Sequence, residues 1–310
     1  MRIVFLILTL TTYSYARKIS CHACINKVCY IRSKIIDGYK LSGQLAIDRT
    51  SNVIYFHYQN NSKDYTGAFD MIDVKLTLIK NLTFTFAYAV DQSSRNLYAS
   101  GAKGIYVYNP TTNTTKLHGL EGITIWQMQY DNKLYYTEFL KKGLYIYENK
   151  KSKNILELSK YQIDDFIIDK RGDIYFMSNY AIYLLKNGAK NVTLFEDEIY
   201  FLATDNSKNA YFIQPYTKGI YKINYKDGKL IGVGAFDKDS PFKLVFDGDN
   251  HIIYYDAHNI KLFYLSPTSN KCSITTRGTG KHRKMFVARS RNYKGYKKTL
   301  KYNQNNTNVR

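Results

Sequence analysis

Aspartate recurs at regular intervals through most of this chain of 310 residues. Each of six copies ends a short apolar run, and a polar turn and a second apolar run follow it, as in LAIDRTSNVIYFHY at 45–58. Carboxylates gathered in a ring could bind a divalent metal or transfer protons. A residue that keeps one place in every repeat usually does a structural job, and an aspartate before a turn accepts hydrogen bonds from the turn backbone. We therefore predict that the six are turn residues: Asp48, Asp91, Asp131, Asp169, Asp205 and Asp247.

The spacing of these aspartates, 36 to 43 residues, indicates a repeated structural unit. Several units continue with a second apolar pair, as in KGIYVYNP at 103–110 and KGLYIYENK at 142–150. Short strands separated by turns, with no helical period, are typical of propeller blades of four strands each. The sequence therefore predicts an all-β fold, a six-bladed β-propeller that spans 37–275 as a single domain.

Functional side chains of a propeller are expected where the innermost strand of each blade enters the central channel. In these repeats that point lies four or five residues before each aspartate. Five residues before, the sequence has Gly43, Phe86, Trp126, Asp164, Tyr200 and Phe242. Four residues before, it has Gln44, Ala87, Gln127, Asp165, Phe201 and Lys243.

The composition of these two sets favours binding over catalysis. Aromatic side chains from different blades can stack on a flat apolar ligand, with a few polar groups to orient it. A divalent-metal hydrolase needs several converging carboxylates or amides, whereas the only carboxylates here are the neighbours Asp164 and Asp165. We predict no catalytic residue, no metal ligand and no cofactor; the alternative is that the aromatic residues only plug the channel. The predicted ligand-binding residues are Phe86, Trp126, Gln127, Asp164, Asp165, Tyr200, Phe201, Phe242, Lys243 and Gln44.

The N-terminal sequence predicts secretion. Residues 1–16 have a basic start, an apolar run and small residues near the expected cleavage point, which is typical of a signal peptide. No later segment is long and apolar enough to span a membrane, so we predict an extracellular protein. Five sequons could carry glycans on that route: Asn60, Asn81, Asn113, Asn191 and Asn305.

Four cysteines suit an oxidising compartment. Cys21, Cys24 and Cys29 lie in the segment 17–36, whereas Cys272 follows the sixth repeat. The two ends of a propeller must meet to close its ring. We therefore predict that a strand at 28–36 completes the last blade beside 260–265, and that Cys272 bonds to one of the first three cysteines, with the choice left open. CHAC also resembles half of a zinc knuckle, but no second pair of ligands accompanies it.

The net charge of +20 is unevenly distributed. After Leu265 the chain contains twelve Lys or Arg residues and no acidic residue. Because 276–310 has no apolar period, we predict a disordered basic tail. Such a tail attracts anionic glycans or surfaces by electrostatics, with no specific nucleic-acid site implied, or it is simply solvated.

The repeat sequences resemble one known family. SGQLAIDRTSNVIYFHYQ at 42–59, AVDQSSRNLYASGAKGIYVYN at 89–109 and ITIWQMQYDNKLYYTEF at 123–139 are similar to the ommochrome-binding proteins, over roughly 37–265. The resemblance implies a secreted haemolymph protein that binds a tryptophan-derived phenoxazinone pigment without catalysis. The chain also resembles, more distantly, calcium-dependent lactonases and strictosidine-synthase-like propellers, whose metal ligands correspond to positions that are mostly aromatic here. The basic tail and the cysteine-rich start depart from the family pattern.

Two other functions compete with pigment binding. The first is a degenerate metal-dependent lactonase or esterase that uses Asp164, Asp165, Gln44 and Gln127. The second is a protein-interaction propeller that uses its loops, with the tail as an anchor.

Overall fold

The computed structural model describes residues 20–82, 85–197, 199, 201–239, 241–256 and 261–272, and all of these lie in one compact unit. The predicted signal peptide, Tyr200, Asn305 and the tail at 276–310 lie outside the described residues. Within the described residues there is no α-helix, and no helix could cross a membrane. The fold is all-β, as predicted.

Four sheets have four strands each, and each sheet follows the order of the chain. The first contains β3 (Lys40–Asp48), β4 (Val53–Asn60), β5 (Lys63–Asp70) and β6 (Lys75–Leu78). The second contains β7 (Tyr88–Val90), β8 (Leu97–Gly101), β9 (Gly104–Asn109) and β10 (Thr114–Gly119). The third contains β11 (Ile125–Asp131), β12 (Lys133–Glu138), β13 (Tyr145–Glu148) and β14 (Lys151–Asn154), and a 3-10 turn follows at Leu156–Leu158. The fourth contains β15 (Asp165–Ile168), β16 (Ile174–Ser178), β17 (Ala181–Leu185) and β18 (Thr193–Glu196).

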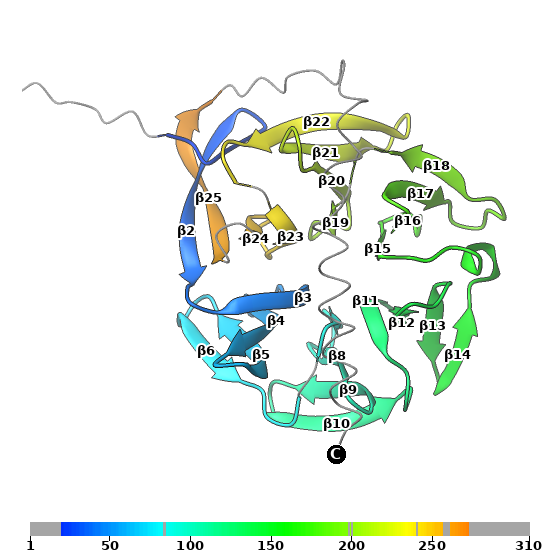
Figure 1. The fold of residues 1–310 in the computed structure, drawn as a ribbon. Helices are drawn as coiled ribbons and strands as arrows, with labels where there is room; N and C mark the ends of the chain where they lie inside the picture. The colour runs from blue at the N-terminus through cyan, green and yellow to red at the C-terminus, as the bar shows by residue number, and fades with distance from the viewer. Residues whose placement is uncertain are drawn as a thin grey trace, which may run out of the picture. The chain divides into compact units, whose positions relative to one another are not determined.

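A fifth, nine-stranded sheet holds the rest of the chain in the order β19-β20-β21-β22-β1-β2-β25-β24-β23. Its strands are β19 (Phe201–Thr204), β20 (Ala210–Gln214), β21 (Gly219–Asn224), β22 (Lys229–Phe236), β23 (Pro241–Phe246), β24 (Ile252–Asp256), β25 (Lys261–Lys271), β1 (Ala23–Ile25) and β2 (Val28–Ile36). The sheets radiate from a common centre (Figure 1). The innermost strands β3, β7, β11, β15, β19 and β23 contact one another in that order, and β23 contacts β3, so the ring is closed. The structure is a propeller with four-stranded blades.

Burial follows the position of a strand within its sheet. All five residues of β16, the second strand of its sheet, are buried. The outer strands β10 and β14 are polar and mostly exposed. Neighbouring sheets pack face to face through apolar clusters, such as the one that joins Tyr55 on β4 to Tyr88 on β7. The apolar inner strands pack against the neighbouring sheets on both faces, and the polar outer strands lie toward solvent. The sheets therefore stand edge-on around the centre.

The repeated aspartates hold the turns that join the first and second strands of a sheet. Asp48 accepts hydrogen bonds from the backbone N–H groups of Thr50 (3.0 Å) and Ser51 (3.2 Å). The same pattern occurs at four further copies, so the prediction is confirmed for Asp48, Asp91, Asp169, Asp205 and Asp247. Asp131 differs: its turn is shorter, and its carboxylate forms an ion pair with Lys208.

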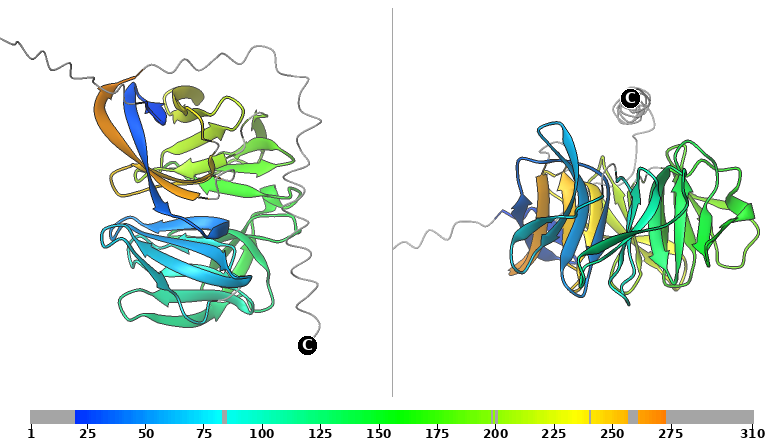
Figure 2. Two further views of the ribbon diagram at one scale, coloured as in Figure 1. Left: turned by 60° about the vertical axis from the view of Figure 1, so that its left-hand side comes forward. Right: turned by 90° about the horizontal axis from the view of Figure 1, so that it is seen from below.

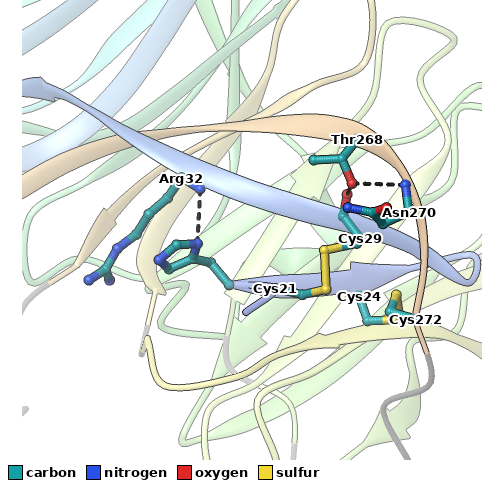
Figure 3. Close-up of a disulfide and its surroundings, with 8 residues drawn as sticks. Cys21, Cys24, Cys29, Arg32, Thr268, Asn270 and Cys272 are labelled. Carbon is teal, nitrogen blue, oxygen red and sulfur yellow. Dashed lines mark hydrogen bonds between the residues drawn. A yellow bond between two sulfur atoms is a disulfide. The ribbon is translucent and has the colours of Figure 1, made fainter. Parts of the chain in front are cut away.

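The N-terminal segment closes the ring, as predicted. Strand β2 pairs with β25, and β1 joins β2 to β22; Figures 1 and 2 show β2, in blue, beside β25, in orange. Disulfides link Cys24 to Cys272 and Cys21 to Cys29 (Figure 3). The bond to Cys272 confirms the predicted link between the two ends. All four thiols are consumed, so the zinc-knuckle alternative is wrong.

Candidate functional site

A cavity of about 170 Å³ lies inside the ring of innermost strands and is lined by all six of them. The repeats follow one another around the ring in the same direction, so their innermost strands begin at the same end of this channel (Figure 1). We call that end the N-terminal mouth. Five of the residues that line the cavity belong to the predicted site: Gln44, Asp165, Phe201, Phe242 and Lys243.

The structure distinguishes the two sets of predicted site positions. Of the residues four before an aspartate, Gln44, Asp165, Phe201 and Lys243 line the cavity, whereas Ala87 and Gln127 do not. Of those five before, Phe242 is the single described residue that does so. The cavity lining includes consecutive residues of each innermost strand, and in three strands it begins at the residue four before the aspartate, at Gln44, Asp165 and Phe201. In β23 the lining begins one residue earlier, at Phe242, and the pairing of β23 with β24 shifts at this place, between Pro241 and Lys243.

An ion pair spans the N-terminal mouth. The Lys243 ammonium lies 3.5 Å from the Asp165 carboxylate, although β15 and β23 are not neighbours in the ring. Burial raises the pKa of Asp165, and the nearby charge of Lys243 opposes that rise. The side chains of Lys243 and Asp165 are 18% and 13% exposed, so water screens the pair only weakly.

Two aromatic rings flank this ion pair. Phe201 and Phe242 meet edge to face, with their ring centroids 5.6 Å apart. The Lys243 ammonium is 5.8 Å from the centroid of the Phe242 ring. The N-terminal mouth thus combines an apolar aromatic corner with one positive and one negative group, an arrangement suited to a flat ligand that carries polar substituents.

Gln44 has a structural partner on each side. Its Nε2 donates to the carbonyl of Met128 (2.7 Å), and its Oε1 accepts from the backbone N–H groups of Tyr88 (3.2 Å) and Met128 (3.0 Å). A bulge in β3 makes this reach possible, because Gly43 adopts a φ of +75° there and a Cβ atom would lie 2.5 Å from the Phe86 carbonyl oxygen. Gln44 therefore satisfies backbone groups of β7 and β11 at the channel wall.

Three other predicted residues do not line the cavity, and two of them join neighbouring sheets. Trp126 donates from Nε1 to the carbonyl of Asp164 (2.9 Å), and its ring packs 5.4 Å from that of Phe139. Phe86 packs against the ring of His57 at 5.1 Å. Gln127 is buried at 4% exposure. The structure does not bring Phe86, Trp126, Gln127 and Asp164 to the cavity.

The opposite end of the channel contains residues that the sequence reasoning missed. Arg49 donates from Nε to the carbonyl of Phe246 (3.1 Å) and from Nη2 to that of Thr204 (2.9 Å). Burial lowers the pKa of Arg49, and Asp205 and Asp247 oppose that effect. Arg49 directly follows a repeated aspartate, and a basic residue at that position is the sequence feature that could have identified it. Arg49 ties β3 to the ends of β19 and β23.

Glutamine side chains complete the same end. Gln92 donates to the carbonyl of Ile47 (2.7 Å) and accepts from the Arg49 N–H (3.0 Å). Gln129 accepts from the backbone N–H of Ile168 (2.9 Å). Each innermost strand pairs with another strand on one side only. These amide side chains therefore form some of the backbone hydrogen bonds that a strand on the other side would have formed.

A serine, a histidine and an aspartate form a chain of contacts inside the first sheet. Ser42 Oγ lies 2.5 Å from His57 Nδ1, and His57 Nε2 lies 3.1 Å from the Asp64 carboxylate. This order resembles a nucleophile, base and acid. However, His57 is 1% exposed, and Ser42 does not line the channel cavity. The contacts connect the adjacent strands β3, β4 and β5, and we assign them a structural role.

This chain of contacts predicts a loss of stability in acid. The hydrogen bond from His57 lowers the pKa of Asp64. A carboxyl whose pKa is lowered on folding stabilises the fold above its unfolded-state pKa, and that contribution disappears as the pH falls through its folded-state pKa. We expect Asp64→Asn to be less stable than wild type at pH 7, with the difference shrinking toward pH 2. Urea unfolding across that range measures it, and a difference that is independent of pH would contradict the assignment.

Solved structures of known proteins support the fold. A gluconolactonase from Xanthomonas campestris matches with a TM-score of 0.60 at 10% identity, over 79% of this chain and 92% of that one. A calcium-binding protein, regucalcin, from Agrobacterium tumefaciens matches with a TM-score of 0.60 at 12% identity, over 80% of this chain and 98% of that one. At these identities the likeness concerns the fold alone, and it agrees with the propeller described above.

The channel residues of this chain do not fit a calcium site. Calcium takes six to eight oxygen ligands, mostly from carboxylates and carbonyls. The ammonium of Lys243 beside Asp165 repels a cation, and the amide of Gln44 is engaged by backbone groups. Among the described residues, no group of three or more His, Cys, Asp or Glu side chains could hold a metal ion. Of the four residues of the lactonase alternative, Gln44 and Asp165 line the cavity, whereas Asp164 and Gln127 do not.

Sequence comparison gives one informative relative. No protein-family model matches the chain. The ommochrome-binding protein of Manduca sexta is 25% identical over 265 residues, which cover 82% of this chain and 96% of that protein. The resemblance that the repeat sequences predicted is confirmed: the chain is a homologue of an ommochrome-binding protein.

Proposed function

We propose that this protein is a secreted, non-enzymatic binding protein for a planar aromatic small molecule of the ommochrome type. The observation that carries the proposal is the N-terminal mouth, where the rings of Phe201 and Phe242 adjoin the Asp165–Lys243 pair. The name of the Manduca sexta homologue supports the ligand class. We further propose that the nine-stranded sheet is two blades joined through β1, which makes the propeller six-bladed.

Each side chain at the mouth has a role in the proposed complex. The Phe201 and Phe242 rings contact the faces and edges of the ligand, where each aromatic contact contributes roughly 0.5–1.5 kcal/mol beyond area burial. Lys243 pairs with a carboxylate of the ligand, and Asp165 accepts from an N–H group. Neither step transfers a proton or breaks a covalent bond, so the site orients the ligand without acting on it.

The size of the cavity limits how the ligand enters. Sites for small molecules usually measure roughly 300–1,000 Å³, whereas the channel cavity is about 170 Å³. A tricyclic ligand therefore inserts one edge and leaves the rest at the mouth, and the Asp165–Lys243 pair separates to admit it. A carboxylate of the ligand then pairs with Lys243 in place of Asp165, and an N–H group of the ligand pairs with Asp165 in place of Lys243.

Secretion is part of the same proposal. The two disulfides are typical of proteins that fold in an oxidising compartment. Four of the five sequon asparagines are described residues, and all four are exposed: Asn60, Asn81, Asn113 and Asn191. We expect glycans at these positions.

Substitutions at the mouth test the location of the site. We expect Phe201→Ala to weaken binding of xanthommatin by about tenfold, because a ring contact and its buried area are lost. Phe195→Ala is the matched control, since Phe195 packs against Tyr175 and Phe212 away from the cavity. Calorimetric titration measures both variants. Equal affinities for wild type and Phe201→Ala would place the ligand elsewhere.

A further inference from the structure

A second cavity, of about 330 Å³, lies outside the channel, between the ring-closing strands β2 and β25 and the turn that joins β5 to β6. Its volume falls within the range of roughly 300–1,000 Å³ that is usual for small-molecule sites. We call it the seam pocket. The lining residues that matter here are Ile35, Met71, Ile72, Val74, Asp249 and Tyr264.

One side of the seam pocket is apolar and open. Ile72 and Val74 are 70% and 72% exposed, although they are large aliphatic residues. Val74 also has a φ of +51°, a backbone conformation that β-branched residues rarely adopt. Ile35 and Met71 extend the apolar lining inward. Apolar side chains exposed in a cluster at the edge of a cavity mark a surface that a ligand can cover.

The other side of the seam pocket is acidic. The buried carboxylate of Asp247 accepts a hydrogen bond from Tyr264 (2.9 Å) and lies 3.4 Å from the His251 ring. Asp249 is exposed, and its carboxylate has no ion pair in the described part of the chain. The one lysine at the rim, Lys34, pairs with Asp37 (2.5 Å). The uncompensated charge at this side is therefore that of Asp249.

Charge and shape together indicate a class of ligand. We propose that the seam pocket binds a small organic cation, an ammonium group on an aromatic or short aliphatic body. The ammonium pairs with Asp249, and the apolar body lies against Met71, Ile72 and Val74. The carboxylate of Asp249 attracts a cation and repels an anion, so the pocket distinguishes ligands by charge. The proposed site does not depend on the function proposed for the channel.

A titration of the full chain with 2-phenylethylamine tests the proposal, and phenylacetate serves as the probe of opposite charge on the same ring. We expect saturable binding of the amine and at least about tenfold weaker binding of the acid, because the acid meets Asp249 with like charge. Asp249→Asn is expected to weaken binding of the amine about three- to fivefold, which is the effect expected from the loss of an exposed charge pair. Ile72→Ser is expected to weaken both probes, because it removes part of the apolar wall.

Two control variants make the outcome decisive. Asp73→Asn removes the same charge from the neighbouring turn, and Asp165→Asn removes the carboxylate of the channel; neither residue lines the seam pocket. Unchanged amine affinity in both controls, with the loss in Asp249→Asn, supports the proposal. No saturable binding of the amine, or equal losses in Asp73→Asn and Asp249→Asn, would overturn it. A loss in Asp165→Asn alone would place the amine in the channel and would also overturn it.

Discussion

Replacing Cys24 and Cys272 with serine is expected to lower the free energy of unfolding by about 5 kcal/mol. This disulfide spans a sequence separation of 248 residues, almost the whole described chain. Closing so long a loop removes much conformational entropy from the unfolded state. The loss is comparable with the whole stability of many domains, which is about 5–15 kcal/mol. Urea unfolding at neutral pH under non-reducing conditions measures it.

The second disulfide provides the control. Cys21 and Cys29 are separated by 8 residues, so the same entropy relation gives about 2.5 kcal/mol for the double serine variant. Both variants remove two cysteines from the same end of the ring, and they differ mainly in loop length. Equal losses in the two variants would show that local packing, and not closure of the ring, accounts for the stabilisation.

Arg49→Met is expected to lower the free energy of unfolding by about 3 kcal/mol or more. The substitution keeps the aliphatic length of the side chain but leaves the carbonyls of Phe246 and Thr204 without their donor. It also removes the positive charge beside the buried carboxylates of Asp205 and Asp247. Thermal and urea unfolding measure the loss.

Arg171→Met is the matched control for Arg49→Met. Arg171 is exposed, donates to the carbonyl of Tyr225 and stacks on its ring. Exposed contacts of this kind contribute up to about 1 kcal/mol. Equal losses of stability in the two variants would show that the contacts of Arg49 across the channel contribute no more than an exposed contact, which would contradict the prediction.

The fold could be predicted from sequence because its signals are local and repeated. A turn aspartate followed by an apolar run marks the first two strands of each sheet, and the pattern needs no knowledge of distant contacts. The link of Cys272 to the N-terminal segment followed from the need to close a ring. The choice of Cys24 did not follow, because it depends on how β1 pairs with β22 at Cys24 and Ala235.

The site was harder to predict, because its geometry depends on residues far apart in the chain. Alternation along a strand cannot say which of two adjacent residues faces the channel, and Trp126 turned out to face a neighbouring sheet. The bulge at Gly43 and the pairing shift beside Phe242 break the alternation locally. The pairing of Lys243 with Asp165 joins two repeats that are not neighbours, and no pattern within one repeat contains it.

Titration of the wild-type protein with xanthommatin, followed by the visible absorbance of the pigment, tests the proposed pigment binding directly. We expect one saturable site for each chain with a roughly micromolar dissociation constant, which a few stacked rings and one charge pair can supply. Chelation of divalent metals is expected to leave the titration unchanged, because the mouth does not fit a calcium ion. No saturable change in absorbance up to roughly 100 µM pigment, or binding that requires a divalent metal, would contradict the proposed function.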